Sequence, residues 1–115
     1  MATLTETHLG LNWTLYSASS VTADDTTSVI DTREATRVMA YGSVELLQLQ
    51  ANTDPTASGP GSTFDTMTSN AGLVAQAGSG DKWTHIHTSC IPPYIRFHNN
   101  DGGAVDVSIL VRRRP

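Results

Sequence analysis

The stretch "PYIRFHNNDGGAVDVSILVRR", residues 93–113, carries the clearest structural pattern in the chain. Successive side chains of an extended segment alternate between two faces, so "YIRFHNN" places Ile95 and Phe97 together on one face. The segment "AVDVSILV" repeats this pattern with four apolar residues, which are Val105, Val107, Ile109 and Val111. The residues between the two segments, "NNDGG", favour a tight turn. We therefore predict a β-hairpin from Tyr94 to Val111, with the apolar faces of both strands in the core.

Elsewhere the apolar residues come in short groups separated by Thr, Ser, Gly, Asn and Asp, which is typical of all-β domains with many turns. The segment "LNWTLYS" alternates, and we expect Leu11, Trp13 and Leu15 to face inward. The segment "ATRVMAYGSVELLQLQAN" contains good helix formers, but a Gly-Ser pair interrupts it and favours two strands. The predicted fold is all-β, an antiparallel β-sandwich of jelly-roll-like form in a single domain.

Length and composition narrow the class of protein. A chain of 115 residues is enough for one domain that buries about two thirds of its extended surface. Its 38% of apolar and 16% of charged residues fit a globular domain, and they exclude both a disordered acidic tail and a membrane span. The net charge of −4 disfavours non-specific binding to nucleic acid. Only the basic stretch Arg112–Arg114 favours such binding. The single cysteine, Cys90, cannot form an internal disulfide.

The N-terminal segment differs from the rest of the chain. "MATLTETHLG" has no basic stretch followed by an apolar run, so we expect no secretory signal and synthesis in the cytoplasm. Residues 1–10 are mostly polar, with Leu4 and Leu9 as apolar exceptions, and we predict an N-terminal arm that is mobile by itself. Residues 11–115 are predicted to form the β-sandwich domain.

Two histidines raise the question of a metal site. In "WTHIHTSC", residues 83–90, His85 and His87 share one face of a strand, an arrangement that can present two imidazoles to one ion. A zinc or iron site needs a third ligand, and His98 is the candidate, because the chain has no glutamate after Glu45. The alternative is a polar strand face, which we favour. We therefore predict no bound metal and no cofactor.

The motifs of covalent catalysis and of phosphate binding are missing from the sequence. Cys90 alternates onto the face of Ile86, where we expect it to be buried as a small apolar residue. No serine stands in a Gly-X-Ser-X-Gly motif. The glycines of "ASGPGST" and "AGSGDK" lack the spacing and the Lys-Thr end of a phosphate-binding loop. We predict that the protein is not an enzyme.

The stretch from "RVMAYGSVELLQLQANTD" through "PPYIRFHNNDGGAVDVSILVRR" resembles small virion proteins of tailed bacteriophages, over about the last two thirds of the chain. The shared motifs are a strand such as "VELLQLQAN", a Pro-Tyr-(Ile/Val)-Arg-(Phe/Val) strand, a Gly-rich turn and a Val-rich last strand. Here the last three are Pro93–Phe97, Gly102-Gly103 and Val105–Val111. The chain departs from the commoner pattern in its middle loop, where the aromatic residue is delayed to Phe64.

This resemblance implies a head decoration, or cement, protein on the outer surface of the virion capsid. Such a protein binds the major capsid protein, is often trimeric, and stabilises the phage head. We expect a homotrimer with neither nucleic acid nor a membrane as a partner. Contact with the capsid or with a neighbouring subunit is expected from the N-terminal segment, at Met1, Ala2, Thr3, Leu4 and Leu9.

Three other interpretations stay open. The first is another virion protein, associated with the tail, the neck or a fibre. The second is a carbohydrate-binding β-sandwich, for which Trp13, Trp83 and Tyr94 have to line up exposed on one face, because sugar rings stack on aromatic rings. The third is a small metal-dependent barrel enzyme.

Overall fold

The structure, a computed structural model, describes residues 1–42, 47–52, 65–66, 82–86, 91–99 and 102–115. The secondary structure of these residues is entirely β, and no helix among them is long and apolar enough to cross a membrane. The strands are β1 (Thr5–Gly10), β2 (Trp13–Val21), β3 (Ile30–Asp31), β4 (Ala35–Gly42), β5 (Leu47–Asn52), β6 (Asp65–Thr66), β7 (Lys82–Ile86), β8 (Tyr94–Asn99) and β9 (Val105–Arg113). The predicted all-β class is confirmed.

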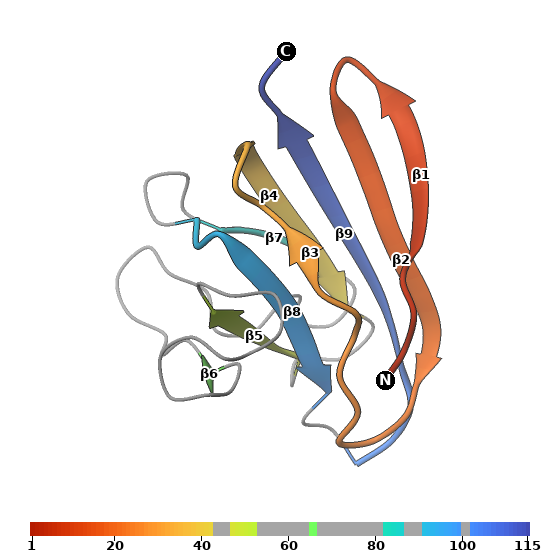
Figure 1. Ribbon diagram of the computed structural model, residues 1–115. Coiled ribbons are helices and arrows are strands. Elements are labelled where there is room, and N and C mark those ends of the chain that lie inside the picture. Colours follow the sequence, from red (N-terminus) through yellow and green to blue (C-terminus); the bar gives the residue numbers. More distant parts are fainter. Residues whose placement is uncertain (43–46, 53–64, 67–81, 87–90, 100–101) are drawn as a thin grey trace.

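The strands form two antiparallel sheets, which pack as a sandwich (Figure 1). The five-stranded sheet has the order β1–β2–β9–β4–β7, and the four-stranded sheet has the order β3–β8–β5–β6. Four of the strand pairs nest inside one another: β2 with β9, β3 with β8, β4 with β7, and β5 with β6. This nesting is that of one long antiparallel ribbon rolled around a core, with β4 brought beside β9 and β5 beside β8. The described strands therefore form a jelly roll of eight strands, to which β1 adds an edge strand.

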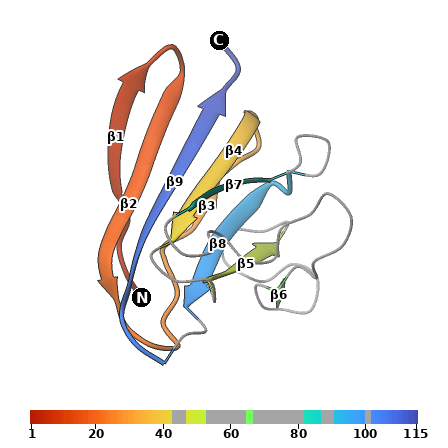
Figure 2. The same ribbon diagram turned by 180° about the vertical axis from the view of Figure 1, so that it is seen from behind.

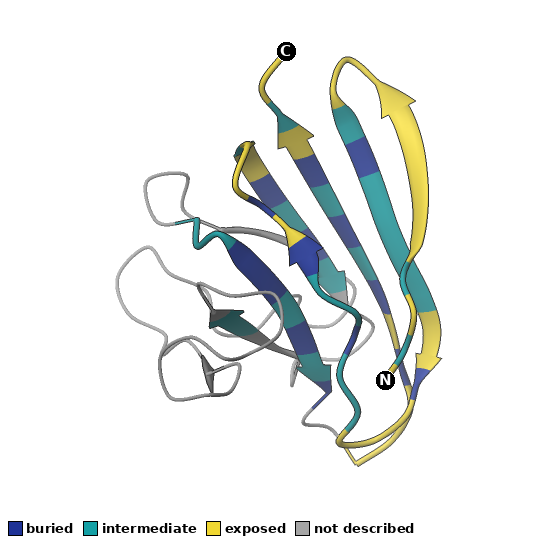
Figure 3. Ribbon diagram, viewed as in Figure 1, coloured by how far each residue is buried: buried dark blue, intermediate teal, exposed yellow. Residues whose placement is uncertain are grey.

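The core lies between the two sheets and is built from the alternating apolar residues of the central strands (Figure 3). Its residues are no more than 1% exposed, and they are Val21, Ile30, Val38, Ala40, Ile95, Phe97, Val105, Val107, Ile109 and Val111. The predicted burial of the apolar faces of β8 and β9 is thus confirmed. The two strands predicted in the segment of good helix formers are confirmed as well, as β4 and β5, which lie in different sheets.

The prediction that Tyr94 to Val111 forms a β-hairpin is wrong, because β8 and β9 belong to different sheets. Both strands alternate as predicted, but their apolar faces meet across the core instead of lying side by side. A period of two residues specifies which face of a strand is buried. Two strands that face each other satisfy this period as well as two strands that pair.

Asn99 holds the place where the chain leaves β8. Its side chain is fully buried, and Nδ2 donates to the carbonyl oxygens of Val21 at 3.0 Å, Thr22 at 3.1 Å and Gly103 at 2.9 Å. These acceptors lie at the end of β2 and just before β9. One amide therefore ties together the ends of three strands from both sheets.

The expected orientation of β2 is also wrong. Tyr16 pairs directly with Ile109, and residues directly opposite in an antiparallel pair share a face, so Tyr16 and Thr14 face the core side. Thr14 is 4% exposed, whereas Leu11 is 83% exposed at the turn before β2. Polar atoms are tolerated on the inner side because they have partners there: the Tyr16 hydroxyl accepts a hydrogen bond from Arg113. The alternate residues of β2 consequently face outward.

The N-terminal segment is ordered by the protein itself, in contrast to the predicted mobile arm. Thr5–Gly10 forms β1, which pairs along its length with β2. Ahead of it, the backbone of Ala2 exchanges hydrogen bonds with Thr26 and Ser28, and the Leu4 amide donates to the Ser28 hydroxyl. Because strand pairing needs backbone groups and few apolar side chains, a mostly polar segment is ordered here without a partner protein.

Candidate functional site

The structure places the two described candidate metal ligands in different sheets. His85 lies in β7, where it pairs with Met39 of β4, and His98 lies in β8 of the other sheet. His98 Nε2 is 3.9 Å from an oxygen of Asp24. His87 and Cys90 lie outside the described residues, and within these residues no three His, Cys, Asp or Glu side chains gather as metal ligands do.

The expected contact residues of the N-terminus have different environments. Ala2 and Leu4 are half-buried and pack against the core, while Met1, Thr3 and Leu9 are exposed. The chain thus uses two of these five side chains for its own fold. Leu9, which is 55% exposed, lies near the tip of the β1–β2 hairpin.

Trp13 and Tyr94, the two predicted rings whose side chains are described, do not form one aromatic platform for sugar stacking. Trp13 lies in the five-stranded sheet, whereas Tyr94 lies in the four-stranded sheet and is 9% exposed. The Arg33 guanidinium lies 5.3 Å from the centroid of the Tyr94 ring. Trp83 belongs to β7, which is separated from β2 by the two strands β9 and β4.

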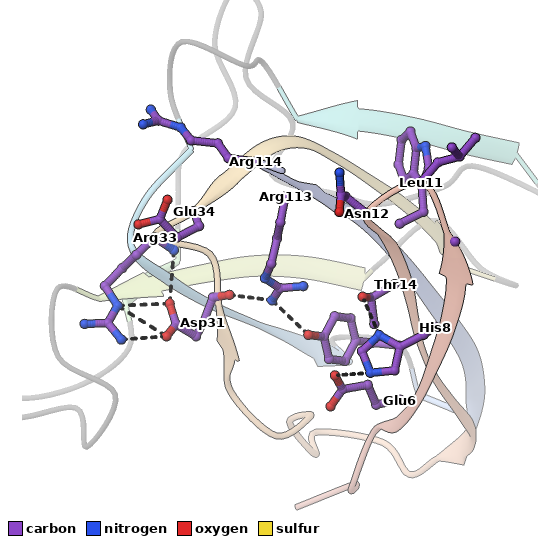
Figure 4. A pocket seen from close by; sticks show the side chains of 13 residues that line it. Glu6, His8, Leu11, Asn12, Thr14, Asp31, Arg33, Glu34, Arg113 and Arg114 are labelled. Atoms are coloured by element: carbon purple, nitrogen blue, oxygen red, sulfur yellow. Dashed lines mark hydrogen bonds and ion pairs between the residues drawn. The ribbon is translucent and has the colours of Figure 1, made fainter.

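An open hollow of about 950 Å³ lies between the β1–β2 hairpin and the turn after β3 (Figure 4). At its centre, Arg113 of β9 extends between the two sheets. Its Nη2 donates to the Tyr16 hydroxyl at 2.8 Å and to the Asp31 carbonyl oxygen at 2.7 Å. One guanidinium therefore links β9, β2 and β3 at the end where the apolar core stops.

The charged side chains of the hollow are largely engaged with one another. Arg33 binds both carboxylate oxygens of Asp31, with Nη2 to Oδ2 at 2.7 Å. This hydrogen-bonded pairing with Arg33 lowers the pKa of Asp31, and the charge of Arg113 adds to the effect. Polar side chains thus cover this end of the sandwich, and hydrogen bonds within the protein hold them in place.

One arrangement in the hollow has the order of a nucleophile, a base and an acid, which the sequence analysis did not consider. Thr14 Oγ1 lies 3.3 Å from His8 Nδ1, and His8 Nε2 lies 3.5 Å from Glu6 Oε1 (Figure 4). The three residues are brought together by β1–β2 pairing, which sets His8 opposite Thr14. However, Thr14 is only 4% exposed, so its hydroxyl is poorly placed to attack a substrate. The arrangement satisfies the buried hydroxyl.

The outer face of the five-stranded sheet, turned away from the four-stranded sheet, is the second candidate surface (Figure 2). Because Ile109 and Val111 point into the core, Leu110 between them points outward. Leu110 pairs directly with Leu15 of β2 on one side and with Met39 of β4 on the other. These three partly exposed side chains, Leu15, Leu110 and Met39, form one line across three adjacent strands, which we name the apolar row.

A second line of outward residues lies next to the apolar row, toward the C-terminal end of β9. Arg112 pairs with Trp13 of β2 and with Arg37 of β4, and we name Trp13, Arg112 and Arg37 the basic row. The Arg112 guanidinium lies 5.9 Å from the centroid of the Trp13 ring. Both arginines are exposed, and they stand directly opposite each other. Trp, Met and Arg are enriched in protein interfaces.

Sequence reasoning missed both rows, although part of the signal was present. In "SILVRR" the burial of Ile109 and Val111 already requires Leu110 and Arg112 to point outward. What joins them to β2 and β4 is the register of the sheet, which one sequence does not reveal.

Comparisons with protein-family models and with curated proteins found no match to the chain.

Proposed function

We propose that the protein is a structural protein of a tailed-phage virion, a decoration (cement) protein of the capsid. In this proposal it lies on the outer surface of the head and binds the major capsid protein through the outer face of its five-stranded sheet. The resemblance of the last two thirds of the chain suggests this class. Jelly rolls occur in viral capsid proteins but also in lectins and cupins, so the fold alone does not assign a function.

The observation that carries the proposal is the apolar row. An antiparallel sheet with one solvated face normally alternates apolar residues inside with polar residues outside. Here β9 breaks the alternation at Leu110, and the residues paired with it, Leu15 and Met39, break it too. A sheet that is apolar on both faces gains from being covered on both faces. A partner protein supplies the second cover in this proposal.

The same proposal includes a homotrimer. Its support is β1, an edge strand whose six residues are all exposed. An open edge of this kind is a template for pairing with another chain, and oligomerisation is one way to cover it. On a lattice the docking contact repeats many times, so a modest free energy at each site adds up over the shell.

The test uses undecorated heads of the phage that encodes the protein, mixed with purified protein and examined by co-sedimentation and electron microscopy. The variant Leu110→Lys places a charge in the apolar row, and Ala23→Lys, in the exposed turn after β2, is the matched control. We expect stoichiometric density on the shell with the wild type and with Ala23→Lys, and loss of binding with Leu110→Lys.

Two results contradict the proposal. If folded Leu110→Lys binds with unchanged occupancy, the outer face is not the docking surface. If the wild type does not bind heads, or decorates a tail, neck or fibre instead, the assignment to the capsid surface is wrong.

A further inference from the structure

We propose that the basic row binds carboxylate groups of the partner protein, so that the surface covered by the outer face is acidic beside its apolar centre. This inference rests on the proposed function and adds to it the chemistry of the partner. It starts from a feature that the fold does not need: two arginines directly opposite each other across β4 and β9.

Arg37 and Arg112 form an unfavourable pair within the isolated protein. Directly opposite residues of an antiparallel pair have Cβ atoms about 5 Å apart, and like charges there lower stability. Among the described residues, the ion pairs within 4.0 Å involve neither of these two guanidinium groups. The Trp13 ring beside Arg112 attracts one cation but carries no countercharge.

The position of Arg37 and Arg112 beside the apolar row indicates which groups the partner places against them. Residues two apart on a strand lie about 7 Å apart, which is the spacing between the basic row and the apolar row. A protein that covers Leu110 therefore also covers or borders Arg112. Two guanidinium groups at the edge of a contact lose water, which is favourable only when oxygen acceptors replace it. Carboxylates match the guanidinium fork with two parallel hydrogen bonds.

The surroundings favour a protein over nucleic acid as the source of these acceptors. A phosphate backbone presents a continuous line of charge and leaves an adjacent apolar row uncovered, whereas a protein surface covers both rows at once. Arg112 and Trp13 are also residue types that dominate the binding energy of protein interfaces.

The first measurement concerns the protein alone. In the double variant Arg37→Gln with Arg112→Gln, repulsion between the two cations is removed, so the thermal midpoint is expected to rise in low salt and to approach that of the wild type in high salt, where charges are screened. A lower midpoint in low salt overturns the inference, because the pair then stabilises the fold.

The second measurement concerns binding to undecorated heads over a series of salt concentrations. The double variant is expected to bind at least tenfold more weakly in low salt and with a smaller dependence on salt. The control Leu110→Ala is expected to weaken binding with the salt dependence of the wild type. If the wild type binds heads and the double variant binds equally well, this inference fails while the proposed function stands. If the wild type does not bind heads, both fail.

A third measurement identifies the acceptors. In Arg112→Lys the charge is kept, and a zero-length carbodiimide reagent can couple the introduced amine to a carboxylate in contact with it. Coupling to Asp or Glu of the capsid protein is expected. Coupling only between copies of this chain, or binding of a short DNA duplex that the double variant loses, overturns the inference and assigns the row to self-association or to nucleic acid.

Discussion

The two faces of the five-stranded sheet differ in how they are covered, although both are built from the strands β2, β9 and β4. The inner face of β9 carries residues such as Ile109, no more than 1% exposed, which the four-stranded sheet covers completely. The outer face carries Leu110 and its two neighbours in the apolar row, which remain partly exposed. Apolar character alone therefore does not distinguish the core from the docking surface that we propose. What distinguishes them is whether the same chain supplies the cover.

The largest expected difference between the faces comes from adjacent residues of β9. Ile109→Asp puts an unpaired carboxylate into the core, at a cost of several kcal/mol, and we expect loss of the folded state. Leu110→Asp, one residue away, puts the same group on the outer face, and we expect a loss below about 1.5 kcal/mol. Urea denaturation followed by circular dichroism measures both. Equal destabilisation by the two variants contradicts the assignment of the faces.

The next residues of the same strand repeat the comparison with arginines. Arg113 on the inner side links Tyr16 and Asp31, so Arg113→Met is expected to lower the free energy of unfolding by about 1.5–3 kcal/mol. Arg112→Met on the outer side is expected to change it by less than about 0.5 kcal/mol. The same denaturation measurement compares them, and a larger loss for Arg112→Met reverses the roles given to the two side chains.

A smaller effect is expected at the tip of the β1–β2 hairpin, which belongs to neither face. Leu11 is exposed and has a φ of 52°, in the left-handed region that bulky residues rarely adopt. Leu11→Asn is expected to raise the free energy of unfolding by about 1 kcal/mol, because Asn tolerates this conformation. Asn12→Leu, with a φ of 66° at the neighbouring position, is the reciprocal variant and should lower it. Changes of the opposite sign show that Leu11 contributes a contact that outweighs the strain.

The smallest effect is expected from pH, in the hollow beside the inner face. Arg33 lowers the pKa of Asp31 from its ordinary value of 3.8, so the pair adds stability above that value, and this contribution is lost as the pH falls through the lower pKa of the folded state. Because both side chains are about half exposed, we expect less than about 1 kcal/mol. In Asp31→Asn the difference from the wild type is expected to disappear in acid below that window. A difference that grows as the pH falls has the wrong sign for this account.

The sequence was sufficient to predict the all-β class and to predict which face of β8 and of β9 is buried. Alternation identified the buried residues of β8 and β9, because period-two burial is a local property. It did not reveal that the two strands lie in opposite sheets, since pairing and facing strands share that period. Alternation also failed for β2, where Thr14 and Tyr16 face inward. Their hydroxyl groups are tolerated there because His8 of β1 and Arg113 of β9 supply hydrogen-bond partners, and one sequence does not reveal these strand neighbours.

The candidate surfaces were harder to predict for the same reason. Arg37 and Arg112 are 75 positions apart in the sequence, and only the register of β4 and β9 sets them opposite each other. The hollow likewise depends on three strands meeting at one end of the core. The pairing of β1 with β2 was not predicted, because strand pairing by backbone groups leaves little trace in the side chains of "TETHLG".

Hydroxyl-radical footprinting of the methionines in free and head-bound protein tests directly whether the outer face of the five-stranded sheet docks on the capsid. Met39 belongs to the apolar row, whereas Met1 is exposed at the N-terminus. If the outer face docks on the capsid, oxidation of Met39 slows strongly on binding while that of Met1 changes little. An unchanged rate at Met39 in head-bound protein, with protection at Met1 instead, contradicts the account and assigns the contact to the N-terminal segment.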